Sequence, residues 1–229
     1  MPFLLAAAAV AAPAGAAERR LSVTDYDRVQ VDGPYEVSLS TGGSSQATLL
    51  GDQAAIDRVS VEVQGRTLRI RPKAMPWGDG RGAASTPARI VLSTRNLTDA
   101  TVAGAGSLAV DRVRGLKIDL AVSGSGSLTV GSVDADNLTL GLVGSGRLLV
   151  SGKAKSVRVF VSGTGDLDAR ALQAEDLVLS SGTSGRIAIS ATRKARVTAE
   201  GRGSVEVLGT SSCTVSGPAA GQVRCGKVN

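Results

Sequence analysis

The sequence has 229 residues, a formal net charge of +6 from 26 Lys and Arg against 20 Asp and Glu, 42% hydrophobic residues and only 2% aromatic residues. This composition supports a globular core and excludes a disordered chain, while the shortage of aromatic rings argues against nucleic-acid binding and against an outer-membrane barrel. The chain has no histidine and only two cysteines, which excludes a Ser-His-Asp triad and a zinc site of ordinary composition.

Residues 1–17 are predicted to be a signal peptide. An apolar run over 3–12 is followed by small residues at Ala14 and Ala16 and then by charged residues, which is the order of an export signal and its cleavage site. We expect cleavage after Ala16 or Ala17, although no Lys or Arg precedes the apolar run. The alternative is a buried N-terminal helix, but so Ala-rich a run would contribute little to a core. The run is also shorter than the roughly 20 residues of a membrane span.

Residues 18–95 are predicted to form an N-terminal β portion, because short apolar runs alternate there with turn signals such as Asp32-Gly33-Pro34. The expected strands are 29–31, 35–39, 47–50, 59–63, 68–70 and 90–92. Within this portion, the stretch 73–87 is rich in Gly and Pro and contains the single tryptophan, Trp77. It is predicted to be an exposed loop, the kind of segment in which function often lies.

Internal repeats dominate residues 96–229 and predict the fold. The clearest units read TVAGAGSLAV, LAVSGSGSLTV, LGLVGSGRLLV and VFVSGTGDLDA. The first apolar residue after the glycines recurs at spacings of 20, 20, 19, 20, 18 and 18 residues, at Leu108, Leu128, Leu148, Leu167, Ile187, Val205 and Val223. Apolar and polar residues alternate within a unit, so each unit has one apolar face that it cannot bury alone. We therefore predict an all-β, right-handed parallel β-helix-like solenoid of about seven Gly-rich coils, continuous with the N-terminal β portion.

The Gly-Ser-Gly element of each unit has a structural explanation. Two glycines around one small residue allow the chain to turn a corner between sheets while the neighbouring coils approach closely. Alignment of the repeats stacks one small residue per coil at this corner: Ala105, Ser125, Ser145, Thr164 and Ser184. We interpret this stack as structural and not as a binding track.

Cys213 and Cys225 both belong to the last repeat and follow an apparent export signal, so we expect them to form a disulfide. Pairing these two residues also pairs Val215 with Val223 about a centre at Ala219, so that inward positions meet across the turn. A bridge there would hold the last coil, which has no neighbour to cover it.

Three parts of the sequence together resemble a known family. They are VTDYDRVQVDGPYEVSLSTG at 23–42, VSVEVQGRTLRIRP at 59–72 and the repeated SGSG with flanking Val and Leu. In their order and spacing they are similar to the GIN-domain family, the putative auto-transporter adhesin head domains. The resemblance spans essentially the whole mature chain, and it implies a β-helix-like fold and an envelope or surface location.

The sequence contains only weak matches to motifs for phosphate binding, glycoside cleavage and calcium binding. The segment 221–228 matches G-x-x-x-x-G-K, but it has Val where a phosphate loop needs Ser or Thr and no helix follows it. Two carboxylate pairs, Asp134 with Asp136 and Asp166 with Asp168, could serve glycoside cleavage, but we interpret them as solvated residues beside corners. Aligned coils do not repeat the Asp of Gly163-Thr164-Gly165-Asp166, which argues against calcium. We predict no catalytic residue, metal or cofactor.

The function predicted from these features is a non-catalytic, exported β-solenoid in the periplasm, at the outer membrane or on the cell surface. It would be adhesin-like or bind an anionic glycan or an envelope protein. The positive charge would favour anionic partners such as acidic polysaccharide or lipid head groups, but the basic residues are dispersed, and we interpret them as a soluble surface with excess positive charge and not as an anion site. We expect no nucleic-acid partner and no transmembrane segment in the mature chain. The alternative is a polysaccharide-processing enzyme on a β-helix, which would need a groove where acidic and basic side chains of adjacent coils converge.

Few residues could anchor a partner. Phe160 and Val143 fall on outward phases of the alternation, Trp77 lies in the predicted loop, and Tyr35 follows a turn. Aromatic side chains often dominate interface energetics, so Trp77, Phe160 and Tyr35 are the predicted contacts. The alternative is that these rings pack into the structure, with Trp77 covering the open end of the coil stack and Phe160 beneath its loop.

Overall fold

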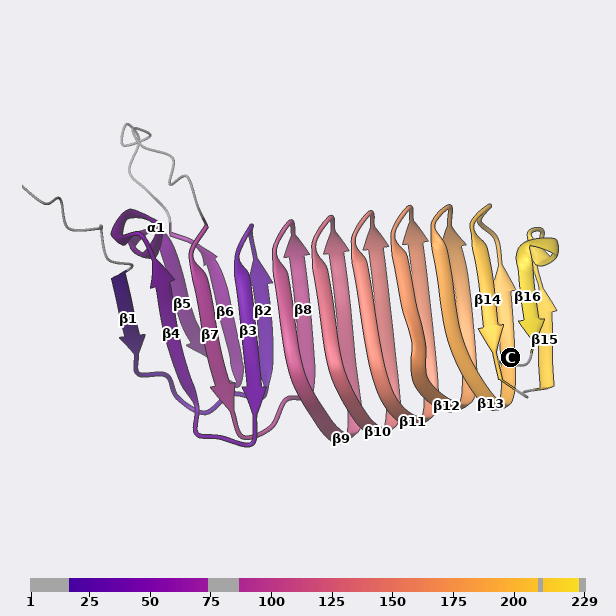
Figure 1. The fold of residues 1–229 in the computed structure, drawn as a ribbon, viewed down its shortest axis with the longest axis horizontal. Helices are drawn as coiled ribbons and strands as arrows, with labels where there is room; N and C mark the ends of the chain where they lie inside the picture. Colours follow the sequence, from indigo (N-terminus) through magenta and orange to yellow (C-terminus); the bar gives the residue numbers. More distant parts are fainter. Residues whose placement is uncertain (1–16, 74–86, 210–211, 227–229) are drawn as a thin grey trace, which may run out of the picture.

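Each central repeat forms one long strand that bends midway and so contributes to two facing sheets. In the computed structural model, which describes residues 17–73, 87–209 and 212–226, these strands stack side by side along one axis (Figure 1). The strands are β1 (Ala17–Leu21), β2 (Arg28–Asp32), β3 (Glu36–Thr41), β4 (Gln46–Gly51), β5 (Val59–Gln64), β6 (Thr67–Pro72), β7 (Arg89–Thr94), β8 (Asp99–Gly104), β9 (Ser107–Gly124), β10 (Ser127–Gly144), β11 (Arg147–Gly163), β12 (Asp166–Thr183), β13 (Arg186–Ala199), β14 (Ser204–Leu208), β15 (Ser212–Ser216) and β16 (Val223–Gly226). Two short helices, α1 (Gln53–Asp57) and the 3-10 helix η1 (Ala220–Gln222), complete the described part. Neither has the length and hydropathy of a membrane span.

The two sheets share the long strands. The first sheet has the order β1-β4-β7-β3 and continues through the first halves of β9 to β13 to β14 and β16. The second sheet has the order β5-β6-β2-β8 and continues through the second halves of β9 to β13 to β15. Pairing is parallel throughout the repeats and antiparallel only at the N-terminal end, for β1 with β4, β4 with β7 and β5 with β6. The predicted parallel β-solenoid is therefore confirmed.

We call the seven apolar residues that follow the corner glycines, Leu108 to Val223, the marker residues. The structure stacks all seven in one column of the first sheet. Leu108 pairs in register with Leu128, and the pairing continues in register through every later marker to Val223. The column also extends toward the N-terminus, because Val37 of β3 pairs with Leu108. The N-terminal portion is thus continuous with the solenoid. The solenoid makes about six turns, and the last marker lies in the short strand β16 and not in a full coil.

A single hydrophobic core fills the space between the two sheets. Inward positions such as Leu128, Leu140 and Val161 are almost fully buried, and the core cluster runs without a break from Tyr26 to Val207. Alternation places one apolar side chain of every two on this inner side, as the sequence predicts. Burial of each Leu or Val contributes about 1.5–3 kcal/mol, so the repeated inner columns supply most of the stabilisation.

The second glycine of each Gly-x-Gly corner leaves no space for a side chain. A Cβ on Gly146 would lie 2.4 Å from the carbonyl oxygen of Gly126 and 2.8 Å from Cγ1 of Val122. The backbone of one corner donates to the corner before it, for example from the Ser145 nitrogen to the Gly124 oxygen at 2.9 Å. The corner glycines therefore permit the close approach of coils that the sequence predicts.

A disulfide joins Cys213 to Cys225, with a Cα–Cα distance of 6.4 Å, and confirms the predicted pairing. Cys213 lies in β15 of the second sheet and Cys225 in β16 of the first sheet, so the bridge spans the two sheets at the C-terminal end of the stack. Val215 and Val223 lie beside it and are only partly buried, because no further coil of the described residues covers them. The disulfide therefore connects the two sheets at the end where the inward side chains are only partly buried.

Replacement of Gly146 by Ala should destabilise the protein by about 2 kcal/mol or more, because the added methyl group must displace backbone of the neighbouring coil. The matched control is Gly141→Ala, where the nearest atom to an added Cβ is Cβ of Ala121 at an ordinary 3.7 Å. This control should change the free energy of unfolding by no more than about 0.5 kcal/mol. Urea unfolding of both variants measures the difference, and equal effects would contradict this account of the corner.

Replacement of both cysteines by Ser should open the last coil without unfolding the rest. The local opening free energy of residues 212–226 should fall by about 2–3 kcal/mol, because the cross-link over 12 residues no longer restricts this segment. Native-state hydrogen exchange, followed by mass spectrometry, measures this change. Amides of β9 to β11 are the internal control, and unchanged exchange in β15 and β16 would show that the bridge does not hold the end.

Candidate functional site

Phe160 projects from the outer surface of the second sheet. It lies in β11 on the outward phase of the alternation, and 52% of its surface is exposed. Val143 of β10 is also exposed, as its phase predicts, and so is Val178 of β12. Their outward orientation makes these side chains available to a partner. The alternative, in which Phe160 packs beneath the loop 73–87, involves residues of which 74–86 lie outside the described part of the chain.

Tyr35 is not available as a contact, which corrects the expectation from the sequence. Only 8% of its surface is exposed, because it shares the inward phase of Val37 and Leu39 at the start of β3. Its ring packs against Gly33, and burial raises the pKa of the Tyr35 hydroxyl. The alternation with two buried neighbours was the signal that could have identified it as core. Trp77 and residues 1–16 of the predicted signal peptide lie outside the described residues.

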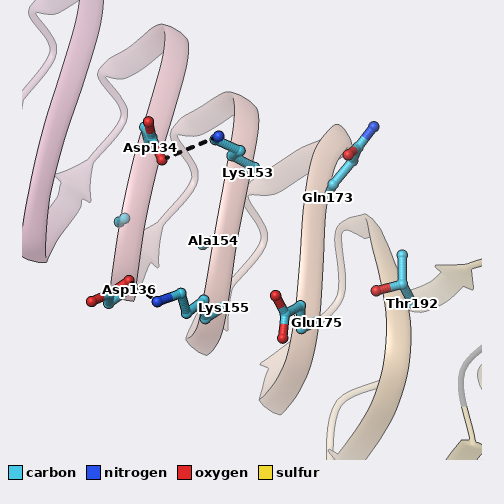
Figure 2. A pocket seen from close by; sticks show the side chains of 9 residues that line it. Asp134, Asp136, Lys153, Ala154, Lys155, Gln173, Glu175 and Thr192 are labelled. Atoms are coloured by element: carbon cyan, nitrogen blue, oxygen red, sulfur yellow. Dashed lines mark ion pairs between the residues drawn. The ribbon is translucent and has the colours of Figure 1, made fainter.

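A groove crosses the bends of β10, β11 and β12 (Figure 2). Its volume is about 310 Å³, and its floor is formed by small residues that include Ala135 and Ala154. Two rows of longer side chains form its walls, and the complete lining is Asp134, Ala135, Asp136, Lys153, Ala154, Lys155, Gln173, Glu175 and Thr192. An adjoining hollow of about 510 Å³ adds Arg112 and Arg114 to this surface. This groove brings acidic and basic side chains of adjacent coils together, which the sequence analysis did not foresee.

The charged side chains of the groove largely neutralise one another. Nζ of Lys155 lies 2.7 Å from Oδ1 of Asp136, and Asp134 lies between Arg114 at 3.1 Å and Lys153 at 3.7 Å. The hydrogen bond to Asp136 raises the pKa of the Lys155 ammonium, so this group stays protonated and cannot act as a base near neutral pH. Glycoside cleavage needs two carboxyl groups that are free to act on the substrate, whereas Asp134 and Asp136 are both engaged in ion pairs.

The second carboxylate pair of the sequence analysis lies on the opposite, first sheet. Asp166 accepts a hydrogen bond from the backbone nitrogen of Arg186 at 2.8 Å, and Asp168 forms an ion pair with Arg170 at 3.5 Å. These contacts tie neighbouring coils and the bend together. Within the described ranges, no group of three or more His, Cys, Asp and Glu side chains is arranged to hold a metal ion.

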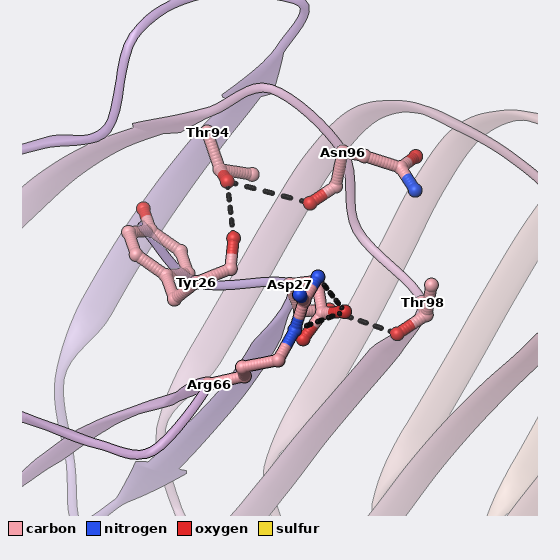
Figure 3. A network of polar contacts seen from close by, with 6 residues as sticks. All are labelled: Tyr26, Asp27, Arg66, Thr94, Asn96 and Thr98. Atoms are coloured by element: carbon pink, nitrogen blue, oxygen red, sulfur yellow. Dashed lines mark hydrogen bonds and ion pairs between the residues drawn. The ribbon is translucent and has the colours of Figure 1, made fainter. Parts of the chain in front are cut away.

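A polar cluster that is partly buried joins the ends of four strands in the N-terminal portion (Figure 3). Oγ1 of Thr94 donates to the carbonyl oxygen of Tyr26 at 2.5 Å, and Oγ1 of Thr98 donates to the carbonyl oxygen of Asp27 at 3.1 Å. Nε and Nη2 of Arg66 both donate to Oδ2 of Asp27, at 2.9 and 2.6 Å. Burial raises the pKa of the Tyr26 hydroxyl well above its usual range, so it stays neutral. The cluster satisfies backbone groups between strands, while Oδ1 of Asp27 is buried without a hydrogen-bond partner among the described residues.

Asp99 begins β8 beside this cluster, and it pairs in register with Asp119 of β9 and Arg28 of β2. Partial burial raises the pKa of the Asp99 carboxyl, and the nearby Asp119 carboxylate raises it further. The ionised form is therefore less favourable in the folded state than in the unfolded state. The ionised Asp99 carboxylate therefore lowers the stability of the folded state. The hydrogen bond from Thr101 and the charge of Arg28 offset part of this cost.

Asp99→Asn should accordingly raise the free energy of unfolding at neutral pH by up to about 0.5 kcal/mol. The advantage over wild type should shrink as the pH falls through the raised pKa of Asp99, because wild type then loses the unfavourable charge. Urea unfolding between pH 7 and pH 4 measures both effects. Asp168→Asn on the other sheet is the control, and a loss of stability in Asp99→Asn at neutral pH would contradict the assignment.

Three solved structures share the fold over nearly the whole chain. A putative adhesin from Bacteroides fragilis NCTC 9343 matches with a TM-score of 0.79 and 17% identity, over 94% of this chain and 98% of that chain. A putative lipid binding protein from Parabacteroides distasonis ATCC 8503 has a TM-score of 0.69 and 21% identity, over 95% and 98%. A putative adhesin from Parabacteroides merdae ATCC 43184 has a TM-score of 0.68 and 17% identity, over 95% and 98%. At these identities the likeness establishes the fold.

Comparison with curated proteins gives no match. The family model "Putative auto-transporter adhesin, head GIN domain" matches residues 25–211, which include β2 to β14. The resemblance found in the sequence is thus confirmed, and the chain belongs to the GIN-domain family of putative auto-transporter adhesin head domains.

Proposed function

We propose that this protein is a non-catalytic, exported module that binds a partner at the cell envelope or surface through the outer face of its solenoid. The observation that carries the proposal is the exposure of Phe160 and its apolar neighbours on a flat sheet, where no other described element covers them. An exposed aromatic on such a surface is typical of a contact site. The adhesin names of two structural relatives support the same kind of function.

Two features support export. The disulfide between Cys213 and Cys225 is of the kind that persists in oxidising compartments. The described strand β1 (Ala17–Leu21) pairs with β4 over its whole length. Cleavage after Ala16 would therefore leave β1 intact at the end of the first sheet.

The second candidate function is a polysaccharide-processing enzyme, and the groove lined by Asp134, Asp136, Lys153, Lys155 and Glu175 is the observation that favours it. We place it second because Asp134 and Asp136 are held in ion pairs and their side chains are 35% and 40% exposed. A catalytic carboxyl group needs instead to be free to reach the substrate.

Binding and cleavage can be separated in one experiment. Purified protein with residues 17–229 is incubated with envelope fractions and secreted polysaccharides of the cell that produces it. We expect retention of the protein on at least one fraction and no new reducing ends or unsaturated sugars. Asp134→Asn/Asp136→Asn should be retained as well as wild type. Product formation that this double variant abolishes would establish the enzyme, and a lack of retention on every fraction would overturn the binding function.

A further inference from the structure

The outer surface of the second sheet between β10 and β15 has an unusual composition. We call it the Phe160 face and define it by these outward residues, which begin one row beyond the outward row that contains Asp176 and Lys194: Thr139, Gly141, Val143, Arg158, Phe160, Ser162, Val178, Ser180, Arg196, Thr198, Thr214 and Ser216. It combines hydroxyl groups, small residues, three exposed apolar side chains and two arginines. Not one of these residues is acidic. The face is therefore basic on a polar, flat background.

The arginines of the Phe160 face are not neutralised. Arg158 pairs in register with Thr139 and Val178, and Arg196 pairs with Val178 and Thr214, so their lateral neighbours carry no negative charge. Neither arginine forms an ion pair with any residue that the structure describes.

Three carboxylates border this face: Asp119, Asp176 and the exposed Glu200, which follows Thr198 on the same outward phase. The first two have partners of their own. Asp119 lies 3.4 Å from Nζ of Lys117, and Asp176 pairs with Arg193. The groove beside the bends is also internally paired. Of these surfaces the Phe160 face is thus the one with a positive charge that a partner could satisfy.

The ring of Phe160 is free to accept a ligand. Its neighbours across the strands are Gly141 and Ser180, both too small to cover it. A Cβ built on Gly141 would have no atom of Phe160 within 4 Å, so the ring does not lie down on that glycine. Val143 and Val178 flank it diagonally, one strand away on either side. The three side chains form an oblique apolar stripe over three coils.

We propose that the Phe160 face binds an anionic polysaccharide that lies along the solenoid axis. This inference rests on the proposed binding function and specifies its ligand. Arg158 and Arg196 are separated by one intervening strand, β12, and therefore by about 9.6 Å of sheet. That separation suits acidic groups on alternate sugars of a linear chain. Each guanidinium pairs with a carboxylate or sulfate, and one sugar ring stacks on Phe160.

The hydroxyl groups of the face favour a polysaccharide over a lipid surface or a protein. Ser162, Ser180 and Thr198 can each donate and accept hydrogen bonds, which matches the hydroxyl groups of sugars. The three apolar side chains are dispersed among small polar residues and offer no continuous apolar area for insertion into a bilayer. A protein interface of standard size would also need a larger set of anchors.

The test uses residues 17–229 and isothermal titration calorimetry with three soluble probes: polygalacturonate, dextran sulfate and neutral dextran. The proposal expects binding to at least one anionic probe and none to neutral dextran. Phe160→Ala and the double variant Arg158→Ala/Arg196→Ala should each weaken binding about tenfold or more. Phe160→Trp should retain it, because the ring is kept. Thermal unfolding of each variant should match wild type, since these side chains are exposed.

The matched control is Arg147→Ala/Arg186→Ala. These two arginines lie on the same two strands, β11 and β13, but on the first sheet and with Asp166 between them, so the change in net charge is identical. The control should bind within about twofold of wild type, since an exposed charge at this distance acts weakly through salt solution. If both double variants weaken binding equally, attraction is nonspecific and the proposal is overturned.

Other outcomes distinguish failure of the polysaccharide proposal from failure of the proposed binding function. Retention on envelope fractions that neither anionic probe displaces would overturn the polysaccharide but leave the binding function intact. Binding only to vesicles with about 30% phosphatidylglycerol would also overturn the polysaccharide ligand and leave the binding function intact. It would show that the Phe160 face binds a lipid surface. Failure to bind any probe or fraction would overturn both proposals.

Discussion

The fold depends on one spatial constraint, which is that successive coils must stack at the spacing of neighbouring strands, about 4.8 Å, at their corners as well as along their sheets. The second glycine of each corner meets this constraint, because a Cβ at Gly126 or Gly146 would fall within 2.4 Å of a carbonyl oxygen of the coil before it. With the corners in contact, the backbone hydrogen bonds continue around the turn. Because the corners of successive coils are held in register, the side-chain columns on both sheets are aligned as well.

Strict register has consequences for charge. A side chain at a given position of one coil lies beside the same position of the next coil, so like charges would be directly opposed. Two columns avoid this by alternating signs, whereas Asp99 and Asp119 are directly opposed in the second sheet. Arg114, Asp134 and Lys153 form such a column at the bends, and Arg147, Asp166 and Arg186 form another on the first sheet. The second sheet departs from this pattern, since Arg158 and Arg196 are separated only by Val178.

The same architecture determines what kind of partner the surface suits. A solenoid presents flat, repeating columns and not a deep pocket, and the groove at the bends has a volume of about 310 Å³ and is lined in part by the buried Ala135 and Ala154. Extended ligands with a repeat of their own match such a surface better than small compact molecules do. The ends have a different role, because they interrupt the repeat. At the C-terminal end, the disulfide holds two short strands whose inward valines lack a covering coil.

The sequence by itself determined the parallel solenoid, its register and its disulfide. Spacing of 18–20 residues between the markers, together with the period-2 alternation, is enough to place Leu108 beside Leu128 and to send Phe160 outward, because both follow from local geometry. The same alternation could have identified Tyr35 as a core residue, since it is in phase with Val37 and Leu39; its position after a turn was the misleading signal.

Only the tertiary structure decided which side chains meet on the outside. Asp134 faces Lys153 because the register shifts between Val130 and Val133, where one coil is a residue shorter than the other. The bend of the long strands then turns these columns into a groove. Likewise, the absence of acidic residues from the Phe160 face becomes visible only when the second halves of the repeats are assigned to one sheet. Local pattern fixes the direction in which a side chain points, whereas its neighbours depend on how distant segments stack.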